Sequence, residues 1–184
     1  VQEPQDLAPG RTSELHSPNM LLSGHEGTVY SCAFDPSGKI LASGSKDRNI
    51  FLWEVFGEEC TNYNVLKGHK NAVLDVKWLP GMANASSLVS CSADKMVSLW
   101  DADKGTRLRK FDEHGAIVNC CNIDRRNPNV VVSGSDDCTA ILWDIRSKNN
   151  VSMVHDYQVT SVAITDGGNS VYTGGIDNII RKWD

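Results

Sequence analysis

The segment SGSKDRNIFLWE, residues 43–54, recurs in altered form as SCSADKMVSLWD (residues 90–101), SGSDDCTAILWD (residues 133–144) and TGGIDNIIRKWD (residues 173–184). In every copy a hydroxyl residue stands four positions before an Asp, and a Trp stands six positions after that Asp. Successive Trp residues are 47, 43 and 40 positions apart. A repeat of about 40–45 residues that ends in Trp-Asp is the sequence signature of a four-stranded propeller blade.

A His also precedes each Asp, by 22 to 25 positions. We expect the Asp to accept a hydrogen bond from this His. The hydroxyl would then join the His to the indole N–H of the Trp, which can only donate. Such a network satisfies polar groups that would cost about 1–3 kcal/mol each if they were buried unpaired. The predicted structural network comprises His25, Ser43, Asp47 and Trp53; His69, Ser90, Asp94 and Trp100; His114, Ser133, Asp137 and Trp143; and His155, Thr173, Asp177 and Trp183.

The same residue types suggest the triad of a hydrolase, which is recognised by geometry and roles. However, the set occurs four times at equivalent positions, each time with a Trp as a fourth member. An enzyme needs one such site, so the repetition favours a structural role. The four His residues lack the paired spacing of zinc ligands. We therefore expect no catalytic, cofactor-binding or metal-binding residue and no small-molecule substrate.

The rest of each repeat is typical of β-structure. Short runs rich in Val, Ile, Leu and aromatic residues alternate with Gly, Asn, Asp and Ser. No stretch longer than about ten residues has clean helical periodicity, so the fold is predicted to be all-β. The expected strands are Met20–Leu22, Thr28–Phe34, Lys39–Gly44, Ile50–Val55, Val65–Lys67, Ala72–Trp78, Leu88–Cys91, Val97–Asp101, Arg107–Phe111, Ile117–Ile123, Val130–Gly134, Ala140–Ile145, Val151–Val154, Val159–Ile164, Ser170–Gly174 and Ile179–Asp184.

The repeats define the expected domain organisation. Residues 20–184 are predicted to form propeller blades from units 20–55, 63–101, 107–145 and 151–184, the last without its outer strand. Propellers commonly hold more than four blades, and ring closure removes their edges, so we expect an incomplete part of a seven-bladed ring. The alternative is a four-bladed ring in which Met20–Leu22 pairs beside Ile179–Asp184. Residues 1–19, with three Pro and few large apolar groups, are predicted to be a disordered leader.

Composition limits the classes of partner. The net charge of −5 argues against a broad nucleic-acid face, which needs clustered Lys and Arg, so contact with nucleic acid is expected to be indirect at most. No apolar run approaches the length that spans a membrane, and no membrane partner is expected. The start of the chain lacks the features of a secretory signal. Reduced thiols are therefore expected for the six Cys residues.

The repeats resemble those of the WD40 family, with Leu22-Ser23-Gly24-His25 and Leu66-Lys67-Gly68-His69 at the Gly-His motif and Trp-Asp or Trp-Glu at the end. The third repeat has Glu113 before its His, and the fourth has Val154. This departure makes the fourth network the least secure. The resemblance implies a β-propeller that presents loops and strand ends to protein partners.

Several strings outside these motifs resemble one group within that family, the WD40 subunits of the U5 small nuclear ribonucleoprotein. They are residues 20–27, Asn62-Tyr63, residues 133–137, residues 143–146, residues 157–159 and residues 174–178. This resemblance implies a nuclear, non-catalytic scaffold in pre-mRNA splicing. Its implied partners are the large spliceosomal scaffold protein and other U5 ribonucleoprotein subunits. A cytoplasmic signalling scaffold of general WD40 type is an alternative.

Candidate partner-binding residues follow from the position of each His. Residues three and five positions after it lie at the start of the inner strand, near the face where propellers often bind. Lys46 and Asp136, each directly before a turn Asp, join them. The candidates are Thr28, Tyr30, Lys46, Leu74, Asn119, Asp136 and Gln158. Separately, Trp143-Asp144-Ile145-Arg146 resembles a motif of substrate receptors for cullin-4 ubiquitin ligases, which would make Arg146 a contact for the ligase adaptor.

Overall fold

Antiparallel β-sheets follow one another along the chain in a computed structural model of the protein, which describes residues 21–56, 62–81, 86–147 and 149–184. Within these ranges there are four sheets and no helix, hence no helix long and apolar enough to cross a membrane. The all-β prediction is confirmed. The predicted disordered leader, residues 1–19, lies outside the described residues.

The strands agree closely with those expected from the sequence, and most boundaries differ by one residue. β4 is longer by three residues at its start. The strands are β1 (Val29–Phe34), β2 (Ile40–Ser45), β3 (Asn49–Glu54), β4 (Asn62–Lys67), β5 (Val73–Trp78), β6 (Ser87–Ser92), β7 (Val97–Asp101), β8 (Thr106–Phe111), β9 (Val118–Ile123), β10 (Val130–Ser135), β11 (Thr139–Asp144), β12 (Asn150–Val154), β13 (Val159–Ile164), β14 (Val171–Gly175) and β15 (Ile180–Trp183).

Each four-stranded sheet combines strands of two successive repeats. The sheet orders are β1-β2-β3-β4, β5-β6-β7-β8 and β9-β10-β11-β12, and the last sheet is β13-β14-β15. The outer strands β4, β8 and β12 belong to the second, third and fourth repeat in sequence, yet each pairs with the third strand of the repeat before it. The boundary between sheets therefore lies one strand away from the boundary between sequence repeats.

The strand predicted at Met20–Leu22 is not formed. Met20 lies outside the described residues, and Leu21 and Leu22 are not in a strand. The physical reason is pairing: β4, β8 and β12 each lie against the third strand of another repeat, and no described strand pairs with residues 21 and 22. The prediction was wrong because it assigned an outer strand to every repeat without asking which sheet would receive it.

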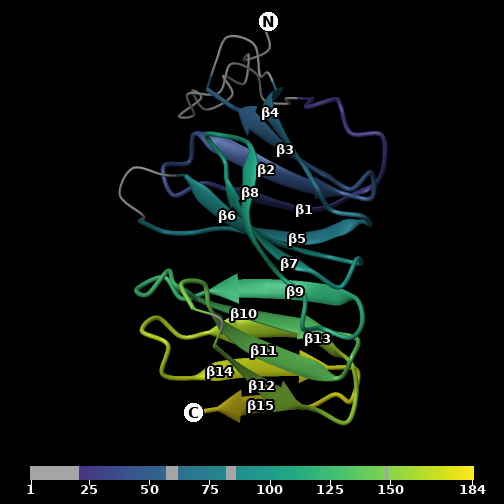
Figure 1. Ribbon diagram of the computed structural model, residues 1–184, viewed down its shortest axis with the longest axis vertical. Helices are drawn as coiled ribbons and strands as arrows, with labels where there is room; N and C mark the ends of the chain where they lie inside the picture. The colour runs from purple at the N-terminus through teal and green to yellow at the C-terminus, as the bar shows by residue number, and fades with distance from the viewer. Residues whose placement is uncertain (1–20, 57–61, 82–85, 148) are drawn as a thin grey trace, which may run out of the picture.

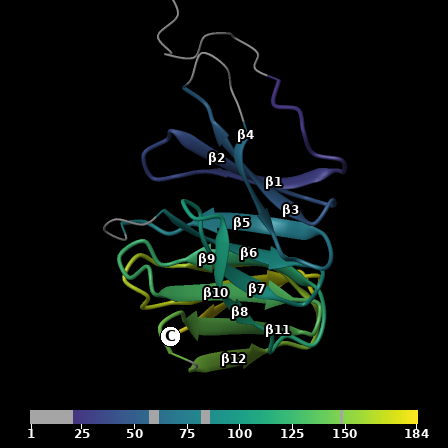
Figure 2. The same cartoon turned by 45° about the horizontal axis from the view of Figure 1, so that its top comes forward.

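The sheets stack in chain order, with the first and last at opposite ends of the long axis (Figure 1). The innermost strands β1, β5, β9 and β13 lie side by side along the stack. In the turned view the first sheet again lies at one end of the molecule (Figure 2). β15 pairs only with β14 among the described strands, so the alternative of a closed four-bladed ring is not what the structure shows.

An apolar cluster fills each junction between consecutive sheets. The first junction packs Ile50, Leu52 and Leu66 against Val73 and Trp100 of the next sheet. All residues of β6 and β7 are buried, because the second sheet is covered on both faces. The three junctions together form the core, with buried apolar area as its main source of stability.

Close approach between sheets depends on small residues in the second strand. A Cβ placed on Gly134 would lie 2.7 Å from a methyl of Val159 and 2.9 Å from a methyl of Val162. The equivalent Gly174 of the last sheet has nothing within 4 Å of such a Cβ. The same residue type at the same repeat position therefore has a tight neighbour in one sheet and open space in the other.

We predict that Gly134→Ala destabilises this chain by about 1–3 kcal/mol, because the stiff, β-branched Val side chains must shift to admit the extra methyl group. Gly174→Ala is the matched control and should change stability little, since its Cβ meets open space. Urea denaturation of both variants provides the measurement. Equal losses in the two variants would contradict the packing argument.

Candidate functional site

In the first repeat a closed hydrogen-bond network joins four side chains. His25 precedes β1, Ser43 lies on β2, Asp47 in the turn between β2 and β3, and Trp53 on β3. His25 Nδ1 lies 2.7 Å from Asp47 Oδ2 and its Nε2 lies 2.7 Å from Ser43 Oγ. Trp53 Nε1 donates to the same Ser43 Oγ at 2.8 Å. The structure thus places all four residues as the sequence predicts.

The donors and acceptors of this network allow one consistent assignment. The Trp indole can only donate, so the serine oxygen accepts from it, and the serine hydroxyl donates to His25 Nε2. The remaining ring nitrogen of His25, Nδ1, then carries the proton and donates to Asp47. Asp47 also accepts from the backbone amides of Glu26 at 3.0 Å and Asn49 at 2.9 Å. A neutral imidazole therefore satisfies every partner.

The second and third repeats contain the same contacts. The His–Asp distances are 2.9 and 2.8 Å, the His–Ser distances 2.7 and 2.8 Å, and both Trp–Ser distances 2.8 Å. Burial alone would raise the pKa of Asp94, but the hydrogen bond from His69 and the backbone amides outweigh it and lower that pKa to about 2. Burial lowers the pKa of His114, which favours the neutral ring.

The fourth network differs from the prediction. His155 Nε2 contacts Thr173 Oγ1 at 2.7 Å and Trp183 Nε1 donates to that oxygen at 2.9 Å, but Nδ1 of His155 meets the carbonyl of Met153 at 3.0 Å. Asp177 instead pairs with Arg181. The expected His155–Asp177 contact is therefore absent, because Arg181 replaces the uncharged Phe, Ser or Ile of the other repeats and takes the carboxylate.

The serine hydroxyls of these networks are buried. Ser43, Ser90 and Ser133 are buried at 5%, 0% and 0% exposure, beneath the Trp side chains that donate to them. A serine nucleophile must reach a substrate carbonyl, and these hydroxyls are enclosed and already hydrogen-bonded on both sides. The geometry therefore gives the hydrolase interpretation no support at these three positions.

The candidate partner-binding residues of the first sheet are accessible. Tyr30 on β1 is 49% exposed, and Thr28 and Lys46 are exposed in the adjoining loop and turn. The backbone amide of Lys46 donates to the carbonyl of Thr28 at 2.8 Å, so these two candidates lie next to each other. An aromatic ring, a hydroxyl and a cation thus share one exposed edge of the molecule.

The candidates on the other sheets are less accessible. Leu74, Asn119, Asp136 and Gln158 are all half-buried. Asn119 Nδ2 donates to Asp136 Oδ1 at 2.7 Å and to the carbonyl of Val159 at 3.0 Å. This pair therefore ties the third sheet to the fourth in addition to facing the rim.

Sequence reasoning missed one exposed apolar residue of this edge. Ile176 is 58% exposed, and its backbone amide donates to the carbonyl of Gln158 at 3.3 Å. It stands directly before the turn Asp of the fourth repeat, the position held by Lys46 and Asp136. Considering the residue before the turn Asp in the fourth repeat as well would have found it. We call Thr28, Tyr30, Lys46, Leu74, Asn119, Asp136, Gln158 and Ile176 the rim.

Comparison with known protein families agrees with this geometry. The model of the family "WD domain, G-beta repeat" matches residues 16–54, 60–101, 105–144 and 149–184. The chain belongs to the WD40-repeat family. The second, third and fourth matched segments begin with β4, β8 and β12, which pair with the preceding sheet. Each of these repeats therefore contributes strands to two sheets.

Three curated WD40 relatives cover most of this chain. The U5 small nuclear ribonucleoprotein 40 kDa protein of Dictyostelium discoideum is 45% identical over 97% of the chain and 49% of its own length. Pre-mRNA-splicing factor cwf17 of Schizosaccharomyces pombe is 42% identical, over 95% and 50%. The human U5 small nuclear ribonucleoprotein 40 kDa protein is 46% identical, over 91% and 46%. The chain thus spans about half the length of these relatives.

Arg146, the candidate adaptor contact of the third WD40 repeat, is held by its own chain. Its Nε and Nη2 donate to the two carboxylate oxygens of Asp144 at 3.2 and 3.1 Å. The hydrogen bonds from Arg146 lower the pKa of Asp144. The Arg146 side chain is 65% exposed, so an ion pair at this position lies in solvent and contributes little to stability.

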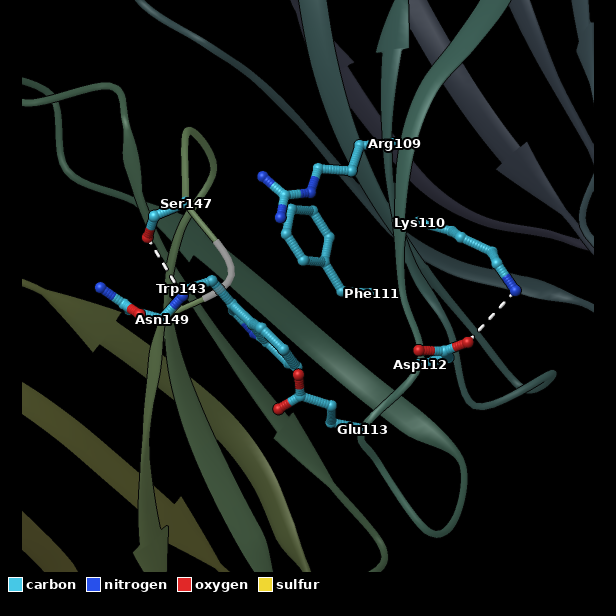
Figure 3. Close-up of a pocket in the computed structure, with 8 residues that line it drawn as sticks. All are labelled: Arg109, Lys110, Phe111, Asp112, Glu113, Trp143, Ser147 and Asn149. Atoms are coloured by element: carbon cyan, nitrogen blue, oxygen red, sulfur yellow. Dashed lines mark hydrogen bonds and ion pairs between the residues drawn. The ribbon is translucent and has the colours of Figure 1, made fainter.

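A pocket of 340 Å³ lies between β8 and the segment that follows β11 (Figure 3). Arg109 donates to the carbonyl of Ile145 at 2.8 Å and lies 5.0 Å from the ring of Phe111. Lys110 and Asp112 pair at its edge. Arg109, Lys110 and Asp112 thus already have partners within the chain. Their charges are therefore not free to bind a ligand in this pocket. The lining residues are Arg109, Lys110, Phe111, Asp112, Glu113, Trp143, Ser147 and Asn149.

We expect Ser133→Ala to lower the free energy of unfolding by about 2 kcal/mol or more, because it leaves the indole N–H of Trp143 and Nε2 of His114 buried without a partner. Ser133→Thr is the matched control: it keeps the hydroxyl, and the fourth repeat has Thr at this position. Chemical denaturation measures both variants. If the Thr variant is as unstable as the Ala variant, the loss of stability is due to the change in side-chain volume and not to the lost hydrogen bonds.

The lowered pKa of Asp94 predicts an acid-sensitive contribution to stability. A carboxylate whose folded pKa is about 2, below the usual 3.8, stabilises the fold fully above pH 3.8 and loses this effect as the pH falls toward 2. The destabilisation caused by Asp94→Asn should therefore fall from about 2 kcal/mol near pH 6 to about half near pH 3. Denaturation at both pH values tests this, with exposed Asp112→Asn as control. A difference that does not change with pH would refute it.

Proposed function

We propose that this chain is part of a non-catalytic protein-interaction scaffold of the U5 small nuclear ribonucleoprotein, acting in pre-mRNA splicing in the nucleus. One observation carries the proposal: 42–46% identity over more than 90% of the chain to proteins named as U5 ribonucleoprotein subunits or as a splicing factor. The implied partners are the large spliceosomal scaffold protein and other U5 subunits. Contact with RNA is indirect in this proposal.

The geometry supports a scaffold in two ways. Each of the four His–hydroxyl–Trp sets serves to fix strands, which leaves no repeated set free for chemistry. The rim meanwhile offers side chains that differ from repeat to repeat, which suits recognition of an irregular partner surface. Tyr30 is the strongest anchor, because exposed aromatic side chains dominate interface energetics.

We predict that Tyr30→Ala in the full-length protein lowers its affinity for the U5 particle by roughly 30-fold, the loss expected when an anchor worth about 2 kcal/mol is removed. The measurement is affinity purification from nuclear extract, with mass spectrometry of proteins and probing for U5 RNA. Tyr63→Ala is the matched control, since Tyr63 is 42% exposed but lies on the outer strand β4. Equal recovery with both variants would place the binding surface elsewhere.

The same purification distinguishes the ubiquitin-ligase alternative. Recovery of cullin-4 and its adaptor without U5 RNA, lost on Arg146→Ala, would replace the splicing proposal with a substrate-receptor function. Under the splicing proposal Arg146→Ala leaves recovery of U5 RNA unchanged, because this guanidinium pairs with Asp144 away from the rim.

A further inference from the structure

Two thiols and a carboxylate meet at the junction between the second and third sheets. Asp75 lies on β5, Cys91 on β6 and Cys121 on β9. One ligand atom from each, the two Sγ atoms and a carboxylate oxygen, lies within 4.8 Å of the other two. Cys91 and Cys121 are buried at 0% and 2% exposure.

All three residues depart from what most other repeats have at the same position. Asp75 and Cys91 face each other across the β5–β6 ladder, as Ser31 and Gly44, Cys120 and Gly134, and Ser161 and Gly174 do in the other sheets. Cys91 thus replaces a Gly found in every other repeat. Cys121 occupies the position of Cys32, Val76 and Val162, so this position holds Cys in two repeats and Val in the other two. Among the described residues, only at Cys121 does the Cys of this position lie beside a carboxylate and a second thiol. The packing of a blade requires none of these changes, yet they coincide at one junction.

The carboxylate is oriented by its own hydrogen bonds. Asp75 Oδ1 accepts from Ser31 Oγ at 2.8 Å, from the Val76 amide at 2.9 Å and from Lys77 Nζ at 2.8 Å. Asp75 Oδ2 accepts from the Cys121 amide at 3.2 Å and from the Cys121 thiol at 4.0 Å. Oδ2 therefore faces the thiols, and the groups around Oδ1 provide the outer support that metal-ligating carboxylates usually have.

We propose that Cys91, Cys121 and Asp75 bind one thiophilic metal ion of the Zn²⁺ class. Thiolate sulfur binds Zn²⁺ at about 2.3 Å and carboxylate oxygen at about 2.0–2.2 Å, so tetrahedral ligands lie roughly 3.5–3.8 Å apart. The 4.0 Å between Cys121 Sγ and Asp75 Oδ2 needs to close by about half an ångström. A water molecule would supply the fourth ligand.

Charge balance suits this ion. Binding converts two thiols to thiolates and releases two protons to solvent. Two thiolates and one carboxylate carry three negative charges, which the divalent ion and the ammonium of Lys77 neutralise together. A buried site with no net charge avoids the large cost of an isolated buried charge. Lys77 Nζ lies 2.8 Å from Asp75 Oδ1. It therefore supplies the remaining positive charge while leaving Oδ2 free to bind the metal.

The carboxylate end of the proposed site is partly exposed. Asp75 keeps 14% of its side chain exposed and Lys77 keeps 38%. Lys77 also lines a cavity of 590 Å³ at the ends of the inner strands, together with Phe34, Trp78, Asn122 and Arg125. Lys77 therefore contacts both this cavity and the Asp75 carboxylate.

Titration of the reduced, metal-free chain with Cd²⁺, followed by Zn²⁺ competition, tests the site. We expect a thiolate-to-Cd²⁺ charge-transfer band that saturates at one ion per chain, and a rise of the melting temperature with Zn²⁺. Cys91→Gly and Cys121→Val each introduce the residue of other repeats, so they should fold while losing at least about 100-fold in affinity. Asp75→Ser should weaken binding without abolishing the band.

Cys32→Ser is the matched control, because Cys32 is exposed on β1 and should leave the band unchanged. Far-ultraviolet circular dichroism checks that each variant is folded, and either Cys variant alone suffices if the other fails. A reduced wild-type chain that gives no band, with Cys91 and Cys121 acting only as small core residues, overturns the proposal. A band that survives both Cys substitutions also overturns it.

Discussion

One buried hydroxyl in each repeat connects strands that are distant in the chain. In the third repeat Ser133 Oγ accepts from Trp143 and contacts the ring of His114, which itself reaches the turn at Asp137. Three backbone segments are thereby fixed around a single oxygen atom. Losing that atom would leave a buried donor and a buried acceptor unpaired. Only a side chain that carries a hydroxyl can therefore replace Ser133 without this loss. Strand register, turn conformation and the packing of the Trp all depend on it.

The fold was largely predictable because its determinants lie at fixed offsets within one repeat. The recurring positions of the hydroxyl, Asp and Trp residues allowed nearly every strand boundary to be predicted to within one residue. The failures were of a different kind. The predicted outer strand is absent at Leu21 and Leu22, because an outer strand needs the third strand of another repeat as its partner and none of the described strands takes that place. The contact between His155 and Asp177 failed because one substitution, Arg181, competes for the carboxylate. Both errors came from treating each repeat as identical and independent.

The two kinds of surface on this chain follow a division within the repeat. Positions that point into the junctions are filled by buried aliphatic groups and leave little freedom, as the fully buried β6 and β7 show. Positions on the rim vary, from Tyr30 and Lys46 to Asn119 and Asp136, and therefore give each blade its own chemistry. The grouping of Asp75, Cys91 and Cys121 could not be found from the sequence alone, because the residues come from two repeats and meet only when the sheets stack.

The offset between repeat and sheet has a consequence for how such a protein can grow. Because β4, β8 and β12 each join the sheet of the preceding repeat, inserting a whole repeat between two others leaves each of the preceding sheets with four strands. A duplication therefore need not respect the sheet boundary to give a foldable product. This outer strand is hydrogen-bonded to the sheet of the preceding repeat and covalently joined to the strands of its own repeat. Unfolding one repeat would therefore also remove the outer strand of the preceding sheet.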